Sequence, residues 1–347
     1  MYIRKILIAV LLIGLVVMGV ISYGIYQAVF QPNTAFENKE AIVFIPTGAT
    51  FADVKTELQP LIKDMASFSQ VASKKGYATN VKPGKYSLKK GSNNNEIINT
   101  LRSKNIPVKV SFNNQETLAD LAKRISEQIE ADSTSLLKAF ADPQFLTENG
   151  FTGRNALAMY IPNTYELFWN TSAEKFRERM LKEYHRFWND DRKAKAAAQS
   201  LTPLEVSTLA SIVQKETAQV SERSRVAGVY LNRLKINMLL QADPTVIYGV
   251  KEHTGDYDIV IKRVLYKHLE IDSPYNTYKY SGLPPGPIAM PDVSSLEAVL
   301  NPETHDYLYF VADVENFGFH KFARTLAQHN LNRQPYIKWI NAQGTQR

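Results

Sequence analysis

The stretch Leu201-Thr-Pro-Leu-Glu-Val-Ser-Thr-Leu-Ala-Ser-Ile-Val-Gln-Lys-Glu-Thr217 predicts a helix that carries a carboxylate on its apolar face. Thr202 is a favourable N-cap, Pro203 suits the first helical position, and Glu205 completes a capping box. The face that follows is apolar and contains Val206, Leu209, Ile212 and Val213. Glu216 is the next residue on that face, where a core residue would be expected.

Two environments would explain a glutamate at this position. Glu216 either turns outward at the end of the helix, which is the commoner arrangement, or lies in a partly dry cleft. In the second case desolvation raises the pKa of the carboxyl group, as a general acid working near neutral pH requires. The spacing alone favours the first environment.

Several further motifs occur within and after this helix, and they favour the cleft position for Glu216. They are Leu209–Thr217, Val226–Leu234, Met238–Gly249, Tyr275–Tyr278 and Gly282–Ile288. Together they resemble the YceG-like family of endolytic murein transglycosylases, over roughly residues 40 to 332. The catalytic glutamate of that family's Ile-Val-x-Lys-Glu-Thr segment corresponds to Glu216.

The resemblance implies a lytic transglycosylase that cleaves the β-1,4 bond between N-acetylmuramic acid (MurNAc) and N-acetylglucosamine (GlcNAc) in nascent glycan strands. The 6-hydroxyl of MurNAc attacks its own C1, so a 1,6-anhydro end forms and strand elongation stops. One carboxyl group can donate a proton and then accept one, without the second carboxylate of a hydrolase. Two acidic positions of the family correspond here to Leu157 and Asn163, which favours a single essential acid. The alternative is a non-catalytic glycan-binding scaffold of the wall-synthesis machinery, which would not need Glu216.

The segment from Gln241 to Tyr248 supplies the next candidate residues. The resemblance places it beside the cleft, so Gln241, Asp243, Thr245 and Tyr248 are predicted to bind substrate. For Asp243 a purely structural role competes, as the N-cap of a short helix that ends at Gly249.

A Pro/Gly-rich loop and one histidine complete the predicted substrate-binding set. Tyr275, Asn276 and Thr277 offer donors and acceptors suited to glycan hydroxyls and N-acetyl groups. His320 matches a family position. The six histidines show no metal-ligand spacing, and the chain contains no cysteine, Gly-x-Ser-x-Gly motif or phosphate loop. We therefore expect no metal and no cofactor.

The N-terminal segment predicts a membrane anchor. No charged residue occurs between Lys5 and Glu37, and residues 6–29 are long enough to cross a bilayer. A cleaved signal peptide would have a shorter apolar region and a small-x-small site. Arg4 and Lys5 predict that residues 1–5 stay in the cytoplasm and that everything after residue 30 lies outside the inner membrane.

The amino-acid composition limits the kinds of binding partner that can be expected. The net charge is +7, in short pairs such as Lys74-Lys75 and Lys89-Lys90 spread along the chain, which fits an anionic envelope. An arginine-rich tract is missing, so nucleic acid is not an expected partner. The expected partners are glycan strands, the membrane and, through strand termination, peptidoglycan synthases.

The remaining sequence predicts an α+β protein with two parts outside the membrane. Residues 30–112 alternate strand, two helices and strand, which resembles a LysM-like module. That module either binds glycan or acts as a spacer. Residues 113–347 form the predicted catalytic domain, with helices followed by a hairpin around Asn316–Gly318.

Overall fold

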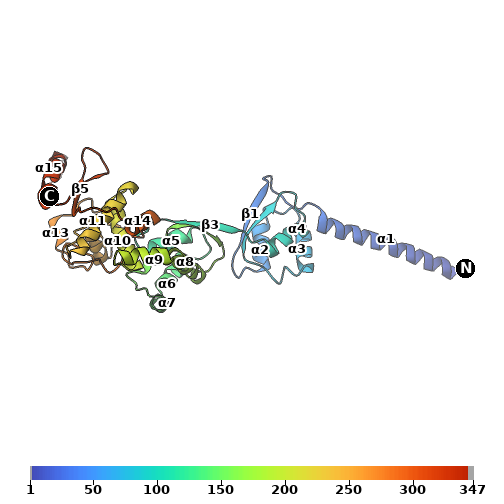
Figure 1. Cartoon of the computed structure of the whole chain (residues 1–347). Coiled ribbons are helices and arrows are strands. Elements are labelled where there is room, and N and C mark those ends of the chain that lie inside the picture. The colour runs from blue at the N-terminus through green and yellow to red at the C-terminus, as the bar shows by residue number, and fades with distance from the viewer. Residues whose placement is uncertain (1, 343–347) are drawn as a thin grey trace. The chain divides into compact units, whose positions relative to one another are not determined.

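A computed structural model describes residues 2–342, which form two compact units (Figure 1). Unit 1 contains the chain up to Val110 together with residues 128–131 and 166–172. Unit 2 contains residues 111–127 and 132–165 and the chain from Ala173 onward. The predicted boundaries at residues 30–112 and 113–347 remain predictions.

The first element is helix α1 (Tyr2–Phe30), which extends from unit 1 (Figure 1). None of its residues is buried, and its mean hydropathy is 2.8 over the most apolar window. At 1.5 Å per residue, 29 residues span about 43 Å. The helix is therefore long and apolar enough to cross a membrane, and it includes the predicted anchor at residues 6–29.

The rest of unit 1 is built around a two-stranded antiparallel sheet. Its elements are β1 (Glu40–Ile45), α2 (Phe51–Leu58), α3 (Met65–Lys74), β2 (Gly84–Lys89) and α4 (Asn94–Ser103). In the sheet, Ala41 lies opposite Leu88 and Ile45 opposite Gly84. The predicted order of strand, two helices and strand is confirmed. The likeness to a LysM module remains a prediction.

Helix N-caps, and the alternation of inward and outward side chains along the strands, account for these elements. Thr50 and Asn93 each form a capping box, with Asp53 and Glu96 respectively. Alternate residues of the strands face the core, which contains Val43, Ile45, Tyr86, Leu88, Phe68, Ile97 and Leu101.

Two strands run from one unit into the other, β3 (Pro107–Phe112) and β4 (Asn163–Phe168). Helices in the first part of unit 2 are α5 (Leu118–Ser126), α6 (Ser133–Phe140), α7 (Pro143–Glu148), α8 (Ala173–Phe187) and α9 (Asp190–Ala198). A 3₁₀ helix, η1, covers Ala156–Met159. Phe176 and Met180 of α8 are fully buried, so this face of the helix packs in the core.

The second part of unit 2 is organised around helix α10 (Pro203–Glu216), which contacts α9 and three later helices. Those are α11 (Arg223–Lys235), α12 (Asp243–Thr254) and α14 (Val293–Leu300); η2 (Val220–Glu222) and α13 (Tyr266–Leu269) are short connectors. The Thr202–Glu205 capping box is confirmed. The helix is buried on all sides from Val206 to Gln214, not on one face as its pattern predicted.

A hairpin and a terminal helix complete unit 2. Strands β5 (Tyr309–Ala312) and β6 (His320–Ala323) pair antiparallel, with Ala312 opposite His320, as the sequence predicted. Helix α15 (Leu326–Ala342) contacts both strands. The described residues thus confirm a mixed α+β fold with one long apolar helix at the N-terminus.

Candidate active site

Glu216 is the last residue of α10 and lies on the wall of an open cleft. The helix ends there because Thr217 adopts an extended conformation (φ −138°, ψ 131°). The Glu216 side chain is half-buried. The cleft has a volume of about 610 Å³ and brings together residues from α10, α11, α12, the β5 strand and α15.

Helix α11 presents two polar side chains to Glu216 from one face. Tyr230 and Arg233 are three residues apart and therefore neighbours on the helix surface. The Tyr230 hydroxyl donates a hydrogen bond to Oε1 of Glu216 at 2.8 Å. The Arg233 guanidinium donates to the carbonyl oxygens of Leu308 (2.7 Å) and Leu240 (2.6 Å), which fix it in the cleft wall.

The surroundings raise the pKa of Glu216 to about 7. Burial is the main cause, because it disfavours the charged carboxylate, and the negative charge of Asp243 acts in the same direction. The hydrogen bond from Tyr230 and the positive charges of His320 and Arg233 lower the pKa in part. The carboxyl group is consequently balanced between its acid and base forms near neutral pH.

Asp243 lines the same cleft, but it is not the N-cap of α12. Ala242 occupies the N-cap position and makes no side-chain cap, while Asp243 is the first helical residue. The Asp243 carboxylate instead accepts a hydrogen bond from the Tyr278 hydroxyl at 2.5 Å. The helix also runs beyond the predicted end at Gly249, to Thr254, where Gly255 closes it in a left-handed conformation (φ 69°).

Gln241 enters the cleft from a turn held by two buried threonines. Its φ of 49° is a left-handed conformation uncommon for a non-glycine residue. Thr277 fixes this turn, since its carbonyl accepts from the Gln241 N–H at 3.1 Å and its hydroxyl accepts from the Ala242 N–H at 3.0 Å. The hydroxyls of Thr245 and Thr277 lie 2.8 Å apart and both are buried. The two threonines therefore support the cleft wall and do not line it.

The loop residues predicted to bind glycan also face inward. Tyr275 and Asn276 are fully buried. The Asn276 side-chain amide donates to the carbonyls of Leu269 (2.8 Å) and Ile271 (2.9 Å). Tyr248 packs against Tyr275 with ring centroids 4.6 Å apart, beside a separate cavity of about 170 Å³. These residues hold the loop that carries Tyr278.

His320 lies behind the cleft wall, on strand β6. Its Nδ1 lies 2.7 Å from Oε2 of Glu222, and its backbone N–H donates to Oε1 of the same carboxylate at 2.8 Å. Glu222 is only 5% exposed, and the His320 ring contacts Phe310, which does line the cleft. His320 thus reaches Glu216 through its charge and not by contact.

Comparison with known proteins identifies the family. The model of the YceG-like family matches residues 43–335. The chain belongs to the YceG-like family. Endolytic murein transglycosylase of Bacillus subtilis is 31% identical over 94% of this chain and 92% of its own length. The Streptococcus pneumoniae protein of the same name is 28% identical over 94% of this chain and 64% of its own length.

A solved structure supports the same assignment. The crystal structure of a YceG-like protein from Listeria monocytogenes is 31% identical to this chain. It superposes with a TM-score of 0.57, over 85% of this chain and 99% of that one.

Sequence reasoning did not select several residues of this YceG-like site. Tyr230, Arg233, Tyr278 and Glu222 all contact or surround the candidate catalytic groups. The first two stand in the Val226–Leu234 motif at helical spacing, which was a usable signal. Tyr278 and Glu222 meet Asp243 and His320 only through the tertiary fold. Residues 2–342 contain no group of three or more histidines, aspartates or glutamates arranged for a metal ion.

Proposed function

We propose that this protein is an endolytic lytic transglycosylase, a lyase that acts on peptidoglycan with Glu216 as its acid and base. Family membership and relatives named endolytic murein transglycosylase support this activity. The observation that carries the proposal is the Glu216 carboxyl group, which faces an open cleft with its pKa raised to about 7. A scaffold that only binds glycan would have no need of such a group.

The reaction assigns one role to each oxygen of Glu216. Tyr230 donates to Oε1, so Oε2 is the oxygen that carries the acid proton toward substrate. Protonated Glu216 gives that proton to the glycosidic oxygen as the bond from MurNAc C1 breaks. The resulting carboxylate is stabilised by Tyr230 and by the positive charges of Arg233 and His320. It then accepts the proton of the MurNAc 6-hydroxyl as this oxygen closes on C1, which restores the acid.

Water attack is the competing chemistry, because Asp243 lies in the same cleft. A hydrolase would use a second carboxylate to activate water or to form a covalent intermediate. Asp243 is held by Tyr278 and affects Glu216 through its charge, which supports a positioning role. The two reactions differ in product: a 1,6-anhydro end is lighter than a reducing end by one water.

Mass spectrometry of products from purified glycan strands tests this function. We expect anhydro-MurNAc ends, and fragments of intermediate length early in the reaction, because the open cleft needs no chain terminus. Reducing ends would mean that water attacks. Early release of disaccharides alone would exclude the endolytic part and leave the role of Glu216 in place.

The anchoring of the enzyme belongs to the same proposal. We propose that α1 crosses the inner membrane, with residues 1–5 in the cytoplasm and everything after residue 30 outside. The absence of charge over its apolar length and the basic residues Arg4 and Lys5 before it support this orientation. Cleavage close to the bilayer would then terminate nascent strands beside the synthases that extend them.

A further inference from the structure

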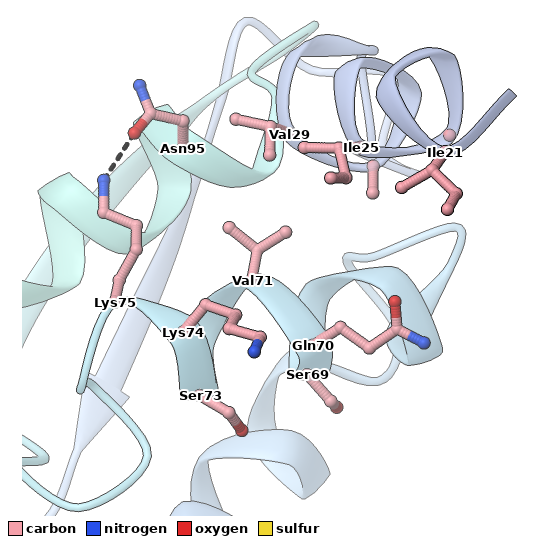
Figure 2. Close-up of a pocket in the computed structure, with 12 residues that line it drawn as sticks. Ile21, Ile25, Val29, Ser69, Gln70, Val71, Ser73, Lys74, Lys75 and Asn95 are labelled. Carbon is pink, nitrogen blue, oxygen red and sulfur yellow. Dashed lines mark hydrogen bonds between the residues drawn. The ribbon is translucent and has the colours of Figure 1, made fainter. Parts of the chain in front are cut away.

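A second cavity lies within unit 1, between the last turns of α1 and helix α3, and it has a volume of about 1150 Å³. Figure 2 shows α1 on one side of it and α3 on the other. We call it the α1/α3 groove. It is lined by Ile21, Gly24, Ile25, Ala28, Val29, Ser69, Gln70, Val71, Ser73, Lys74, Lys75 and Asn95.

The α1 wall of the groove is apolar and uncovered. Ile21, Ile25 and Val29 follow one another along this wall, and Val71 of α3 points toward them (Figure 2). Ile21 and Ile25 remain 57% and 59% exposed, so no part of the described chain covers them. Side chains of this kind require a hydrocarbon neighbour.

The opposite wall ends in two consecutive lysines. The ammonium group of Lys75 donates to the side-chain oxygens of Asn95 and, at 2.7 Å, of Asn99 (Figure 2 draws the first). Within residues 2–342, neither Lys74 nor Lys75 forms an ion pair with a carboxylate. Partial burial lowers the pKa of Lys75, because its charge is removed from water without a negative partner. An anion beside it would reverse that effect.

With the anchoring proposed above, the groove would lie at the depth where a bilayer changes from hydrocarbon to headgroups. About 20 helical residues cross a hydrocarbon core of roughly 30 Å. If the core begins at Ile6, directly after Lys5, it ends near Ile25. Ile21 and Ile25 then lie at the hydrocarbon edge, and Val29 and the two lysines lie at headgroup level.

The net positive charge of the chain lies mainly in residues 31–110, the part of unit 1 that follows α1. Residues 31–110 contain twelve basic and six acidic side chains, a net charge of +6. Residues 111–347 contain 27 basic and 28 acidic side chains, a net charge of −1. The basic side chains themselves are spread along the chain, as expected, but in residues 111–347 the acidic side chains offset them. An anionic surface would attract the part of the chain that follows α1, and not the part that contains the cleft.

From these observations we propose that the α1/α3 groove binds one anionic phospholipid of the surrounding bilayer. The phosphate group contacts Lys74 and Lys75, and an acyl chain lies along Ile21, Ile25 and Val71. A transmembrane helix of a partner would cover the apolar wall but would leave both lysines without an anion. The proposal rests on the membrane anchoring proposed above and does not depend on the chemistry at Glu216.

Native mass spectrometry of the full chain in detergent micelles tests the headgroup contact. The probes are dioleoylphosphatidylglycerol, which is anionic, and dioleoylphosphatidylcholine, which has no net charge. We expect one retained phosphatidylglycerol per chain, and about tenfold weaker binding for the Lys74→Gln/Lys75→Gln variant. The matched control, Lys89→Gln/Lys90→Gln, removes the same charge from exposed positions of unit 1 outside the groove and should change binding less than twofold.

A pair of glycine substitutions tests the apolar wall. A Cβ at either Gly19 or Gly24 would meet nothing within 4 Å, so a leucine side chain begins in open space at both positions. Only Gly24 lines the groove. Gly24→Leu should therefore displace the lipid, with binding reduced about tenfold, while Gly19→Leu should bind as the wild type does.

Three results would overturn the lipid site. These are equal losses for both lysine pairs, a preference for a polyprenyl diphosphate over phosphatidylglycerol, or a lipid-free dimer with both grooves occupied by a second chain. Flotation of the wild-type chain with vesicles is measured in parallel. A chain that does not float disproves the anchoring itself. A chain that floats but retains no phosphatidylglycerol disproves only the groove.

Discussion

The two units of this protein place their ionisable groups in opposite ways. In unit 2, the cleft holds Glu216 against Tyr230 and close to Asp243, and partial burial together with the Asp243 charge raises the pKa of Glu216. In unit 1, the core is apolar and the charges lie on the surface, with an excess of lysine near α1. Unit 2 thus raises the pKa of one carboxyl group, whereas unit 1 presents a net positive charge suited to an anionic surface. Substitutions in unit 2 should therefore not affect lipid binding by unit 1, and substitutions in unit 1 should not affect cleavage at Glu216.

The largest effect should come from Glu216→Gln. This nearly isosteric change removes the proton donor, and we expect glycan cleavage to fall by about 10³-fold or more. Lipid binding in unit 1 should not change. Product release measured by mass spectrometry gives the rate, and near-wild-type turnover would exclude Glu216 as the acid.

Asp243→Asn should reduce activity less and in a pH-dependent way. The charge of Asp243 raises the pKa of Glu216, so its removal should lower that pKa. Since the acid form is required, the decline of kcat with rising pH should begin at a lower pH. We expect about a tenfold loss at pH 7.5. A loss as large as that of the Glu216 variant at every pH would assign catalysis to Asp243.

Tyr230→Phe should move the pH profile in the opposite direction. The Tyr230 hydroxyl stabilises the carboxylate, so its loss raises the pKa of Glu216 further. The decline in kcat should shift to higher pH, while the maximal rate falls about tenfold because the carboxylate formed on proton transfer loses a donor. A rate profile over pH 5–9 compares the two variants. Shifts of the same sign would contradict this account of the site.

Local chemistry made much of this architecture predictable. The capping boxes at Thr50, Asn93 and Thr202, and the β5–β6 hairpin, depend on residues a few positions apart. The burial of α10 on all sides could not be predicted from its sequence, because Ser207 and Thr208 look like a polar, exposed face. In the structure their hydroxyls donate hydrogen bonds to carbonyls of the same helix, so both side chains can be buried. The pattern of one helix cannot report which neighbours surround it.

Of the candidate site, the sequence predicted the acidic residue but not the contacts around it. Glu216 followed from its place on an apolar stripe and from its motif. The partnership of Asp243 with Tyr278 joins residues 35 positions apart, and a hydrophilic loop gave no indication that Tyr275 and Asn276 would face inward. Contacts of that kind depend on tertiary packing and not on local sequence.

Glu216 should also reduce the stability of unit 2 at neutral pH. Its folded pKa of about 7 lies above the ordinary value of 4.5, so the folded state binds the proton more tightly. Protonated Glu216 therefore stabilises the folded state relative to the ionised form. This stabilisation is fully present below pH 4.5 and is lost as the pH rises through 7, where the buried carboxylate becomes charged. At pH 7.5, Glu216→Gln should therefore raise the free energy of unfolding by on the order of 2 kcal/mol. Thermal unfolding at pH 7.5 and pH 4.5 checks this, and a gain at the lower pH alone would reverse the sign.

Removal of residues 1–30 should have the smallest effect on catalysis. Every residue that lines the cleft lies at Glu216 or later, so cleavage of soluble strands should stay within about twofold of the full chain. Unit 1 should lose about 1 kcal/mol, because Asn94 donates to the carbonyl of Ala28 at 2.7 Å. A shorter deletion of residues 1–26 keeps Ala28 and should restore that stability. A folded but inactive protein lacking residues 1–30 would mean that α1 takes part in catalysis, and the separation of the two units' roles would fail.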